Sequence, residues 1–513
     1  MNKHSASISK RWVLPLGVLW SLCSLSLAEP DKPNIVFIMS DDHTTQAIGA
    51  YGSRLAKLNP TPNIDDLARN GMRFDRVFCN NSICTPSRAS IITGQYSQTN
   101  GVLDLDGNIP PERQFLPIEM KKAGYQTAMI GKWHLKREPA SFDYYCVLPG
   151  QGKYHDPEFR IRGDHHWPKN VITKKGMHSS DAITDISLEW LKNKRDKSRP
   201  FFLMHHFKAP HDMFENARRY DRFLEDVHIP EPDNLFSPPN GSVGSRGLGS
   251  GLGLRRHAPW RLGAKLGISN QLDERAYVKS CYQKYLKRYL RCVKGVDDNV
   301  KRLIDYLKQT GELENTVIIY TGDQGFLLGE HDLMDKRWMY EESFRMPFIV
   351  HAPQLIKGGS SNDWLINNTD FAPTILELAG IEKTPEYMQG RSFVGAFQAQ
   401  PKPVNWRTST YYRYWMHMAH SLKTPAHFGI RNERHKLIFF YGCTPDGKNQ
   451  TPVAWEFYDL ENDPLEMQNQ YDNPEYATMI AELKLELKRT RVDLDETDSR
   501  YPAIQAILDT HWN

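Results

Sequence analysis

The stretch NIVFIMSDDH, residues 34–43, joins a continuous apolar run to two adjacent aspartates. A run of this kind predicts a strand that is buried on both faces, as in a parallel sheet covered by helices. Comparable runs recur along the chain with helical patterns between them, the runs at 127–130, 201–207 and 317–321 and the helical patterns at 64–70, 180–194 and 296–309. Alternating strands and helices predict an α/β fold with a large, mainly parallel sheet flanked by helices on both faces.

Beyond residue 400 the pattern changes to short strands of antiparallel type and one helix, at 428–431, 436–441, 455–460 and 475–491. The chain of 513 residues is also too long for one small core. We therefore expect a catalytic α/β domain over 29–400 and a smaller C-terminal α+β subdomain over 401–513. An aromatic cluster is interpreted as packing at the junction of the two: Tyr411, Tyr412, Tyr414 and Trp415.

The N-terminus is typical of a secretory signal peptide. Lys3, Lys10 and Arg11 precede an apolar run from Trp12 to Leu27, which ends in small residues suited to signal peptidase. The run is too short and too early in the chain for stable insertion in a membrane. We therefore expect residues 1–28 to be a signal peptide and the mature chain to be exported, to the periplasm or out of the cell. An uncleaved anchor is the alternative.

The charge of the mature chain is nearly balanced. Residues 1–28 hold three of the 65 basic residues and none of the 61 acidic ones, which leaves a net charge of +1. We therefore expect no nucleic-acid partner and a local site for any anionic substrate. The six cysteines that remain fit no zinc spacing, and the sequence leaves their pairing open: Cys79, Cys84, Cys146, Cys281, Cys292 and Cys443.

Functional side chains follow the predicted strands at the points where they end. In parallel sheets these carboxyl ends meet at one edge, where ligands bind. Three carboxylates and an amide oxygen are hard ligands that suit Ca²⁺ or Mg²⁺, and the cationic groups beside them suit an anion. The acidic and amide set is Asp41, Asp42, Asp323 and Gln324, and the basic set is Lys132, His134, His211 and Lys336.

A further stretch, NNSICTPSRASIITG at 80–94, places a cysteine at the start of a short helix. Pro86 suits the first helical turn, and Arg88 lies four residues after Cys84 on the same side. The positive helix end and the guanidinium both favour an anion there. A thiolate would match a hard metal poorly, whereas an oxygen nucleophile derived from Cys84 would match it well.

These motifs together resemble the type I sulfatase family. Cys84-Thr-Pro-Ser-Arg88 matches the C-x-P-x-R signature of that family, in which an activating enzyme oxidises the cysteine to formylglycine. Three other stretches are also similar to the family, GKWHL at 131–135, the segment from Thr321 to Val350, and FYDLENDPLE at 457–466. The resemblance covers about residues 33–470 and implies an alkaline-phosphatase-like fold.

The resemblance also implies roles for the residues at the matching positions. Asp41, Asp42, Asp323 and Gln324 would hold one calcium ion, with the oxidised Cys84 as a further ligand. Arg88 would stabilise the formylglycine hydrate, and Lys132 and His134 would position it and the sulfate. His211 and Lys336 would bind sulfate oxygens and assist the leaving group. The family commonly has Asn or His where this chain has Gln324. The side-chain carbonyl of Gln324 can still coordinate calcium, so the departure affects only the local geometry.

In the mechanism that follows, an oxygen of the hydrated aldehyde attacks sulfur and releases the substrate alcohol. The second hydroxyl then expels sulfate and restores the aldehyde. Metal and cations stabilise the sulfuryl oxygens. A sugar alkoxide is a poor leaving group, so an acid is needed. We expect His211 to supply the proton, with His134 as the second choice.

The resemblance favours a sulfated carbohydrate as substrate, either a glycosaminoglycan oligosaccharide or an algal polysaccharide such as ulvan or carrageenan. His331 is a candidate substrate contact or a residue that fixes its loop. The glycine-rich segment 237–265 predicts a mobile loop, whose Arg255 and Arg256 either clamp the sulfated chain or are solvated. Two other functions stay open, a phosphoesterase of the same superfamily and an inactive carbohydrate-binding relative.

Overall fold

A ten-stranded mixed sheet lies at the centre of the protein. The computed structural model describes residue 1 and residues 32–163, 166–237, 240–243, 266–269, 271–421 and 423–512, and residues 33–513 form one compact unit. In spatial order the strands are β13 (Ser360–Asn362), β2 (Met72–Phe74), β12 (Phe348–His351), β9 (Thr316–Gly322), β1 (Asn34–Asp41), β8 (Phe201–Pro210), β4 (Gln126–Lys132), β5 (Tyr144–Leu148), β6 (Glu158–Ile161) and β7 (Val171–Thr173).

The five middle strands of this sheet, β9, β1, β8, β4 and β5, run parallel to one another. This confirms the predicted α/β fold and its parallel centre. Antiparallel strands extend the sheet on both sides, β12 beside β9 and β6 beside β5. The sequence did not indicate these margins, because a short edge strand lacks the long apolar run that marks a strand covered on both faces.

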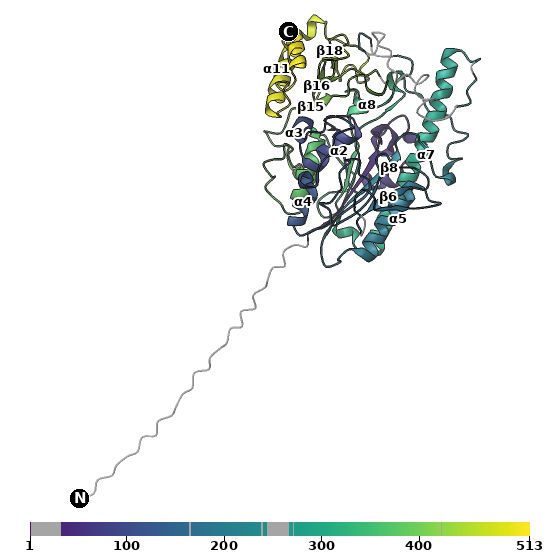
Figure 1. Ribbon diagram of the computed structural model, residues 1–513, viewed down its shortest axis with the longest axis vertical. Helices are drawn as coiled ribbons and strands as arrows, with labels where there is room; N and C mark the ends of the chain where they lie inside the picture. Colours follow the sequence, from purple (N-terminus) through teal and green to yellow (C-terminus); the bar gives the residue numbers. More distant parts are fainter. Residues whose placement is uncertain are drawn as a thin grey trace. The chain divides into compact units, whose positions relative to one another are not determined.

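Helices cover both faces because side chains alternate along each strand. In β1, Ile35, Phe37 and Met39 pack into one cluster, and Val36 and Ile38 pack into the other. As Figure 1 shows, α2 and α4 lie on one side of the sheet and α5 and α7 on the other. The first face is covered by α2 (Cys84–Thr93), α4 (Phe115–Lys122) and α9 (Phe371–Leu378), the second by α1 (Pro62–Arg69), α5 (Ser179–Glu189) and α7 (Glu274–Gln309).

Helix α7 is much longer than the sequence indicated. It begins at Glu274, far upstream of the predicted start at 296, and Asp273 caps it by accepting from the backbone N–H of Ala276. Its first half buries tyrosines and a cysteine among a few aliphatic residues, and Gly295 interrupts the pattern. Because this face is not the usual run of aliphatic residues, periodicity alone did not indicate it. The smaller elements are α3 (Ser97–Asn100), α8 (Glu341–Phe344), α10 (Val394–Phe397) and the strand pairs β3 (Val77–Phe78) with β14 (Ile366–Asn367) and β10 (Leu327–Leu328) with β11 (Met334–Asp335).

The C-terminal part contains a four-stranded antiparallel sheet, as predicted. Its strands are β15 (Ser409–Tyr414), β16 (His427–Asn432), β17 (His435–Phe440) and β18 (Ala454–Asp459), and its helices are α11 (Ala477–Asp493) and α12 (Pro502–His511). The sequence indicated all of these except β15 and α12. The aromatic side chains of β15 are buried, which confirms their interpretation as packing. The division at residue 400 stays a prediction, and it falls between α10 and β15.

Arg413 in β15 is a fully buried cation that connects the sheet to the segment before α12. Its Nη2 lies 2.6 Å from Oδ1 of Asp498, and its guanidinium lies 3.5 Å from the centre of the Trp415 ring. Removal of one partner of a buried ion pair leaves the other charge without compensation in a medium of low dielectric. The pair therefore holds the C-terminal helices to the sheet.

We expect Arg413→Ala to lower the free energy of unfolding by about 1–3 kcal/mol, because Asp498 would stay buried with one acceptor oxygen unsatisfied and Arg491 as its remaining ion-pair partner. Urea denaturation followed by circular dichroism measures this. The control is Lys383→Ala, since Lys383 and Glu386 form an ion pair whose side chains are 84% and 88% exposed, and an exposed pair contributes less than about 1 kcal/mol. Equal, small losses in both variants would contradict a stabilising role for Arg413.

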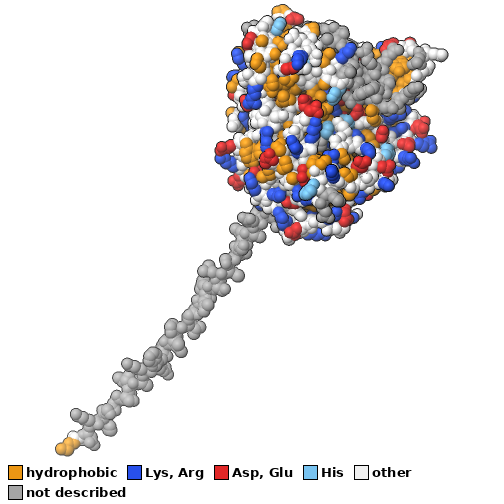
Figure 2. Space-filling view, viewed as in Figure 1, with side chains coloured by type: hydrophobic (Ala, Val, Ile, Leu, Met, Phe, Trp, Pro, Cys, Tyr) orange, Lys and Arg blue, Asp and Glu red, His pale blue; other side chains and the backbone are white. Residues whose placement is uncertain are grey.

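Three sequence predictions fall largely or wholly on residues that the structure does not describe. They concern the signal peptide at 1–28, most of the loop at 237–265, and Arg255 and Arg256 within that loop. Among the described residues, no helix is long and apolar enough to cross a membrane. All six cysteines of the mature chain are buried. On the face shown in Figure 2, acidic and basic side chains are interspersed, in keeping with the balanced net charge.

Candidate active site

The predicted side chains meet at the carboxyl ends of the parallel strands. Strand β1 ends at Asp41 and β4 at Lys132, while β9 and β8 are followed by Asp323 and His211. Asp42, directly after β1, has a positive φ of 65°. Its backbone carbonyl accepts from the hydroxyl of Tyr289 in α7 at 2.7 Å. A turn held in this way directs consecutive carboxylates into one site.

Three carboxylates form the centre of the site. Oxygen atoms of Asp41, Asp42 and Asp323 lie within 4.8 Å of one another, and all three residues are at most 1% exposed. The backbone N–H of Asp42 donates to Oδ1 of Asp323 at 3.1 Å, which connects the ends of β1 and β9. Gln324 is equally buried and its Nε2 donates to Asp42, while its Oε1 is buried and has no hydrogen-bond partner in the part of the chain that the structure describes.

This donor set fits a hard divalent cation. Every candidate ligand atom from Asp41, Asp42, Asp323 and Gln324 is an oxygen, as Ca²⁺ prefers, and the buried Oε1 of Gln324 is available. Burial raises the pKa of Asp42 well above its usual value despite the neighbouring Lys336, and the charges of Asp41 and Asp323 raise it further. Burial and Asp41 likewise raise the pKa of Asp323 to about 6. A cation between these groups would remove this repulsion.

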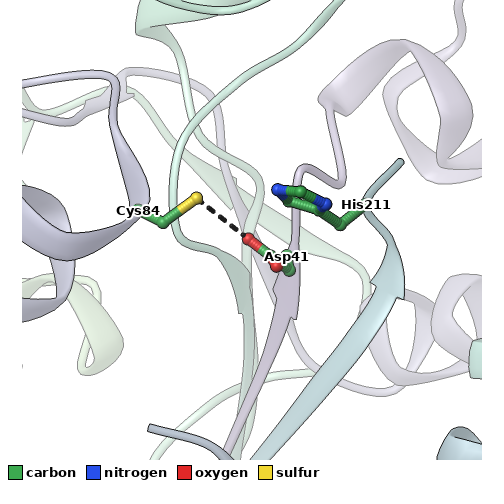
Figure 3. Close-up of side chains that lie close together, drawn as sticks. All are labelled: Asp41, Cys84 and His211. Atoms are coloured by element: carbon green, nitrogen blue, oxygen red, sulfur yellow. Dashed lines mark hydrogen bonds between the residues drawn. The ribbon is translucent and has the colours of Figure 1, made fainter. Parts of the chain in front are cut away.

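Cys84 begins helix α2 and points at the carboxylates (Figure 3). Its Sγ lies 3.3 Å from Oδ1 of Asp41 and 3.4 Å from Nζ of Lys336. All ten residues of α2 are buried. Burial and the charge of Asp41 raise the pKa of the Cys84 thiol well above its usual value, against the opposing effect of Lys336. The unmodified thiol therefore stays protonated and is a poor nucleophile, since the thiolate is the reactive form.

Arg88 holds the carboxylates and β4 in place from the next turn of α2. Its Nη2 lies 2.9 Å from Oδ2 of Asp323 and 3.7 Å from Oδ1 of Asp41, and its Nη1 donates to the backbone carbonyl of Lys132 at 2.6 Å. Arg88 is 3% exposed. A guanidinium fixed on three sides cannot move away from an anion bound beside it, which preorganises the site.

Two buried lysines complete the positive side of the site. Lys132 forms an ion pair with Asp41, and Lys336 forms one with Asp42. Burial alone would lower the pKa of Lys336, but Asp42 and the other neighbouring acids raise it well above its usual value. Lys336 therefore stays charged. If a metal ion neutralises the carboxylates, both ammonium groups can turn to an anionic ligand.

The two predicted histidines differ in their contacts. Nε2 of His211 lies 3.8 Å from Oδ2 of Asp42, and burial and Lys132 lower the pKa of His211 to about 4, with Asp212 acting against them. His134 has a positive φ of 58°, and burial and Lys132 lower its pKa well below the usual value. Its Nδ1 is buried without a hydrogen-bond partner among the described residues. Both rings are therefore neutral near pH 7 in the absence of an anion.

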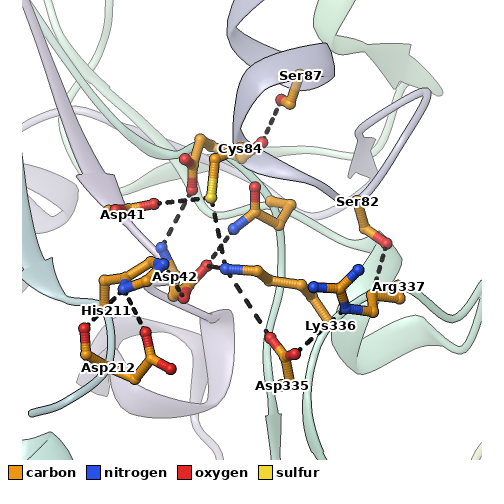
Figure 4. A network of polar contacts seen from close by, with 12 residues as sticks. Asp41, Asp42, Ser82, Cys84, Ser87, His211, Asp212, Asp335, Lys336 and Arg337 are labelled. Carbon is orange, nitrogen blue, oxygen red and sulfur yellow. Dashed lines mark hydrogen bonds and ion pairs between the residues drawn. The ribbon is translucent and has the colours of Figure 1, made fainter. Parts of the chain in front are cut away.

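The structure adds neighbours that the sequence did not indicate, of which Figure 4 labels Asp335 and Arg337. The side-chain oxygen of Gln151, an exposed residue, accepts from Nζ of Lys132 at 2.5 Å. Arg337 contacts Oδ2 of Asp335 at 3.4 Å, and its backbone N–H donates to Ser82 at 3.1 Å. The sequence signal for Asp335 and Arg337 is their position directly before and after Lys336. Nothing in the sequence around Gln151 predicts its contact with Lys132.

His331 lies apart from the carboxylate cluster. It is 1% exposed, its Nδ1 lies 3.4 Å from Nδ2 of Asn234, and its Nε2 lies 3.9 Å from Oε2 of Glu342. Its ring also packs against Tyr340. This burial favours the alternative in which His331 fixes its loop. Its predicted contact with substrate stays a prediction, as does that of Arg255 and Arg256.

Comparison with known proteins identifies the chain. The family model described as Sulfatase matches residues 33–381, and the model described as N-sulphoglucosamine sulphohydrolase, C-terminal, matches residues 329–493. An N-acetylglucosamine-6-O-sulfatase of Bacteroides thetaiotaomicron is 38% identical, over 94% of this chain and 92% of its own. An ulvan-active sulfatase of Formosa agariphila is 25% identical, over 90% of this chain and 80% of its own.

A solved structure of an enzyme in complex with its substrate D-glucosamine-2-N,6-O-disulfate has a TM-score of 0.83 and 36% identity, over 91% of this chain and all of that chain. The α/β sheet carries a buried cluster of carboxylates and cations at its carboxyl edge, an arrangement suited to a metal-assisted hydrolase of anionic esters. Within that class the chain belongs to the sulfatase family, and it is a sulfatase.

Proposed function

We propose that this sulfatase removes sulfate from sulfated glucosamine in glycosaminoglycan oligosaccharides. The similarity to the N-acetylglucosamine-6-O-sulfatase carries this proposal, because it extends over almost the full length of both chains. The second support is the substrate-bound structure at 36% identity, whose ligand is a sulfated glucosamine. Ulvan stays the alternative polysaccharide, supported by a relative of lower identity.

The proposal includes one calcium ion, held by Asp41, Asp42, Asp323 and Gln324 with residue 84 as a further ligand. When bound, calcium would polarise the oxygens of the sulfate ester. Arg88, Lys132 and Lys336 are placed around Cys84, where they can bind the sulfuryl oxygens as negative charge develops on them. His134 lies in the same group of charges and would position the sulfate.

The proposal also assigns the nucleophile to oxidised Cys84. Its support is twofold: the C-x-P-x-R motif lies at the start of α2, and the pKa of the unmodified thiol is raised by burial, which opposes direct attack by a thiolate. Formylglycine in its hydrated form supplies an oxygen nucleophile at this position. A maturation enzyme that oxidises Cys84 is therefore a required partner. Export through a signal peptide at 1–28 is part of the same proposal.

A panel of defined sulfated saccharides tests the substrate. We expect sulfate release from a 6-O-sulfated glucosamine saccharide to exceed release from an ulvan oligosaccharide at least about tenfold in kcat/KM, a difference of about 1.4 kcal/mol in transition-state binding. Ion chromatography of free sulfate measures this. Faster release from ulvan would shift the substrate to algal polysaccharide.

Two aryl esters and the saccharide panel separate the two other functions. A phosphoesterase would hydrolyse 4-nitrophenyl phosphate faster than 4-nitrophenyl sulfate. The two esters have the same leaving group, so their rates differ only through the transferred group. An inactive relative would bind the saccharides and release no sulfate from any of them. Either result would contradict the proposed function. The free energy difference between the two aryl esters reports only the transferred group, because the leaving group is held constant.

A further inference from the structure

Asp212 contacts the ring nitrogen of His211 that faces away from the carboxylate cluster (Figure 4). Nδ1 of His211 lies 2.6 Å from Oδ1 of Asp212 and 2.7 Å from the backbone oxygen of Asp212. Both oxygens are acceptors, so Nδ1 must carry a hydrogen to satisfy either of them. The tautomer of the neutral ring is thereby fixed, with Nε2 as the nitrogen without a proton.

The other side of the ring faces the reacting groups. Nε2 lies 3.8 Å from Oδ2 of Asp42, and an atom of His211 lies within 4.8 Å of both Sγ of Cys84 and a carboxylate oxygen of Asp41. The side chains of His211 and Asp212 are 8% and 11% exposed. The hydroxyl of Tyr154 donates to the backbone oxygen of His211, which holds the backbone at this point. The ring is therefore fixed from its side chain and its backbone.

We infer that Asp212 is a positioning residue, which holds His211 with Nε2 directed at the ester oxygen of the substrate. This inference rests on the proposed function. Asp212 lies outside the GKWHL and C-x-P-x-R motifs, so neither motif indicates a role for it. Its role follows from the two contacts to Nδ1 and from the direction in which they turn the ring.

His211 delivers a proton to the sugar oxygen as the ester bond breaks. The oxygen nucleophile on residue 84 gives its proton to a carboxylate of the cluster, of which Oδ1 of Asp41 accepts from Sγ of Cys84 at 3.3 Å. This oxygen then forms a bond to sulfur, and the bond between sulfur and the sugar oxygen breaks. The electron pair of that bond stays on the sugar oxygen, which takes a proton from Nε2 of His211. The ring is neutral in the free site and takes up this proton from solvent when the anionic ester binds beside it. His211 becomes neutral and keeps its hydrogen on Nδ1, where Asp212 accepts it. A ring turned by half a rotation would present the wrong nitrogen and could not deliver this proton.

The test uses two leaving groups in one variant. Asp212→Asn keeps the size of the side chain, while its amide can donate to Nδ1 and so favour the wrong tautomer. We expect kcat for a 6-O-sulfated glucosamine saccharide to fall about 10- to 100-fold, with KM changed by less than about threefold. For 4-nitrophenyl sulfate, whose phenolate leaves without protonation, we expect kcat to fall by less than about threefold.

Two further variants make the result specific. Asp212→Glu keeps the carboxylate and should recover part of the lost kcat on the saccharide. Glu215→Gln is the matched control, since it removes the same charge from an exposed residue of the same segment and should leave both rates unchanged. Thermal unfolding of each variant compares their folding.

The outcomes separate the inference from the proposed function. A large loss on the saccharide alone supports the positioning role. Equal losses on both esters would overturn it, because Asp212 would then only maintain the structure of the site. No loss on either ester would also overturn it. A wild-type enzyme that hydrolyses neither sulfate ester would overturn the proposed function, and the positioning role with it.

Discussion

Replacement of Cys84 by alanine is expected to abolish turnover, with a loss of at least about 10⁴-fold in kcat, the scale seen when a nucleophile is removed. The fold should be retained, because the change removes one sulfur atom from a buried helix and breaks only the contacts to Asp41 and Lys336. Sulfate release measures the first effect and circular dichroism the second. Residual activity near that of the wild type would contradict a role for residue 84 as nucleophile.

A serine at position 84 distinguishes the proposed nucleophile from a simple hydroxyl. In a host that oxidises only cysteine, Cys84→Ser should become sulfated once and then stop, because serine has no second hydroxyl with which to expel sulfate. Mass spectrometry of the peptide around residue 84 should show this adduct in the variant. In the active wild type it should show an aldehyde that a hydrazine reagent traps. Repeated turnover by a wild type whose Cys84 is wholly an unmodified thiol would exclude the mechanism.

Loss of the metal site is the second change with a large expected effect. We expect Asp42→Asn to lower kcat at least about 10³-fold, since one amide replaces a carboxylate that both balances Lys336 and would bind calcium. The control is Asp65→Asn, because Asp65 is a buried acid in α1 outside the carboxylate cluster. This control should retain activity close to that of the wild type.

Calcium removal provides a readout that does not depend on activity. Chelation should lower the unfolding temperature of the wild type, and added calcium should restore it. Binding to the native state alone contributes about 2.7 kcal/mol at a concentration 100 times Kd. Asp42→Asn should show a much smaller calcium-dependent shift than Asp65→Asn. Full activity and unchanged stability of a calcium-stripped wild type would rule out the metal assignment.

The position of the site could be predicted from the sequence because it follows from topology. Asp41, Lys132 and Asp323 end or follow apolar runs that had to be parallel strands, and the ends of such strands meet at one edge. The same reasoning could not give the contacts of Gln151 or Asp212. Both lie in irregular segments, whose course is set by tertiary packing and not by a repeating pattern.

The limits of the fold prediction have the same origin. Strand β15 has a tyrosine-rich sequence, which suits a strand and a packed surface equally. Its tyrosines are buried in two clusters, Tyr412 and Tyr414 in one and Tyr411 in the other. The sequence did not indicate the start of α7, because tyrosines and a cysteine dilute the aliphatic residues on its buried face. The structure of β15 and of the first half of α7 depends on burial against residues far away in the chain, which a local sequence pattern does not show.

The complete burial of α2 has a consequence for the order of events in the life of the protein. Cys84 is 1% exposed, and the whole helix from Cys84 to Thr93 is enclosed. A separate enzyme that oxidises Cys84 needs the side chain and its flanking residues within its own active site, and the folded chain offers neither. The proposed oxidation of Cys84 would therefore have to come before folding is complete. Under this proposal, a chain that folds first would enclose its thiol and stay inactive, so the relative rates of maturation and folding would set the yield of active enzyme.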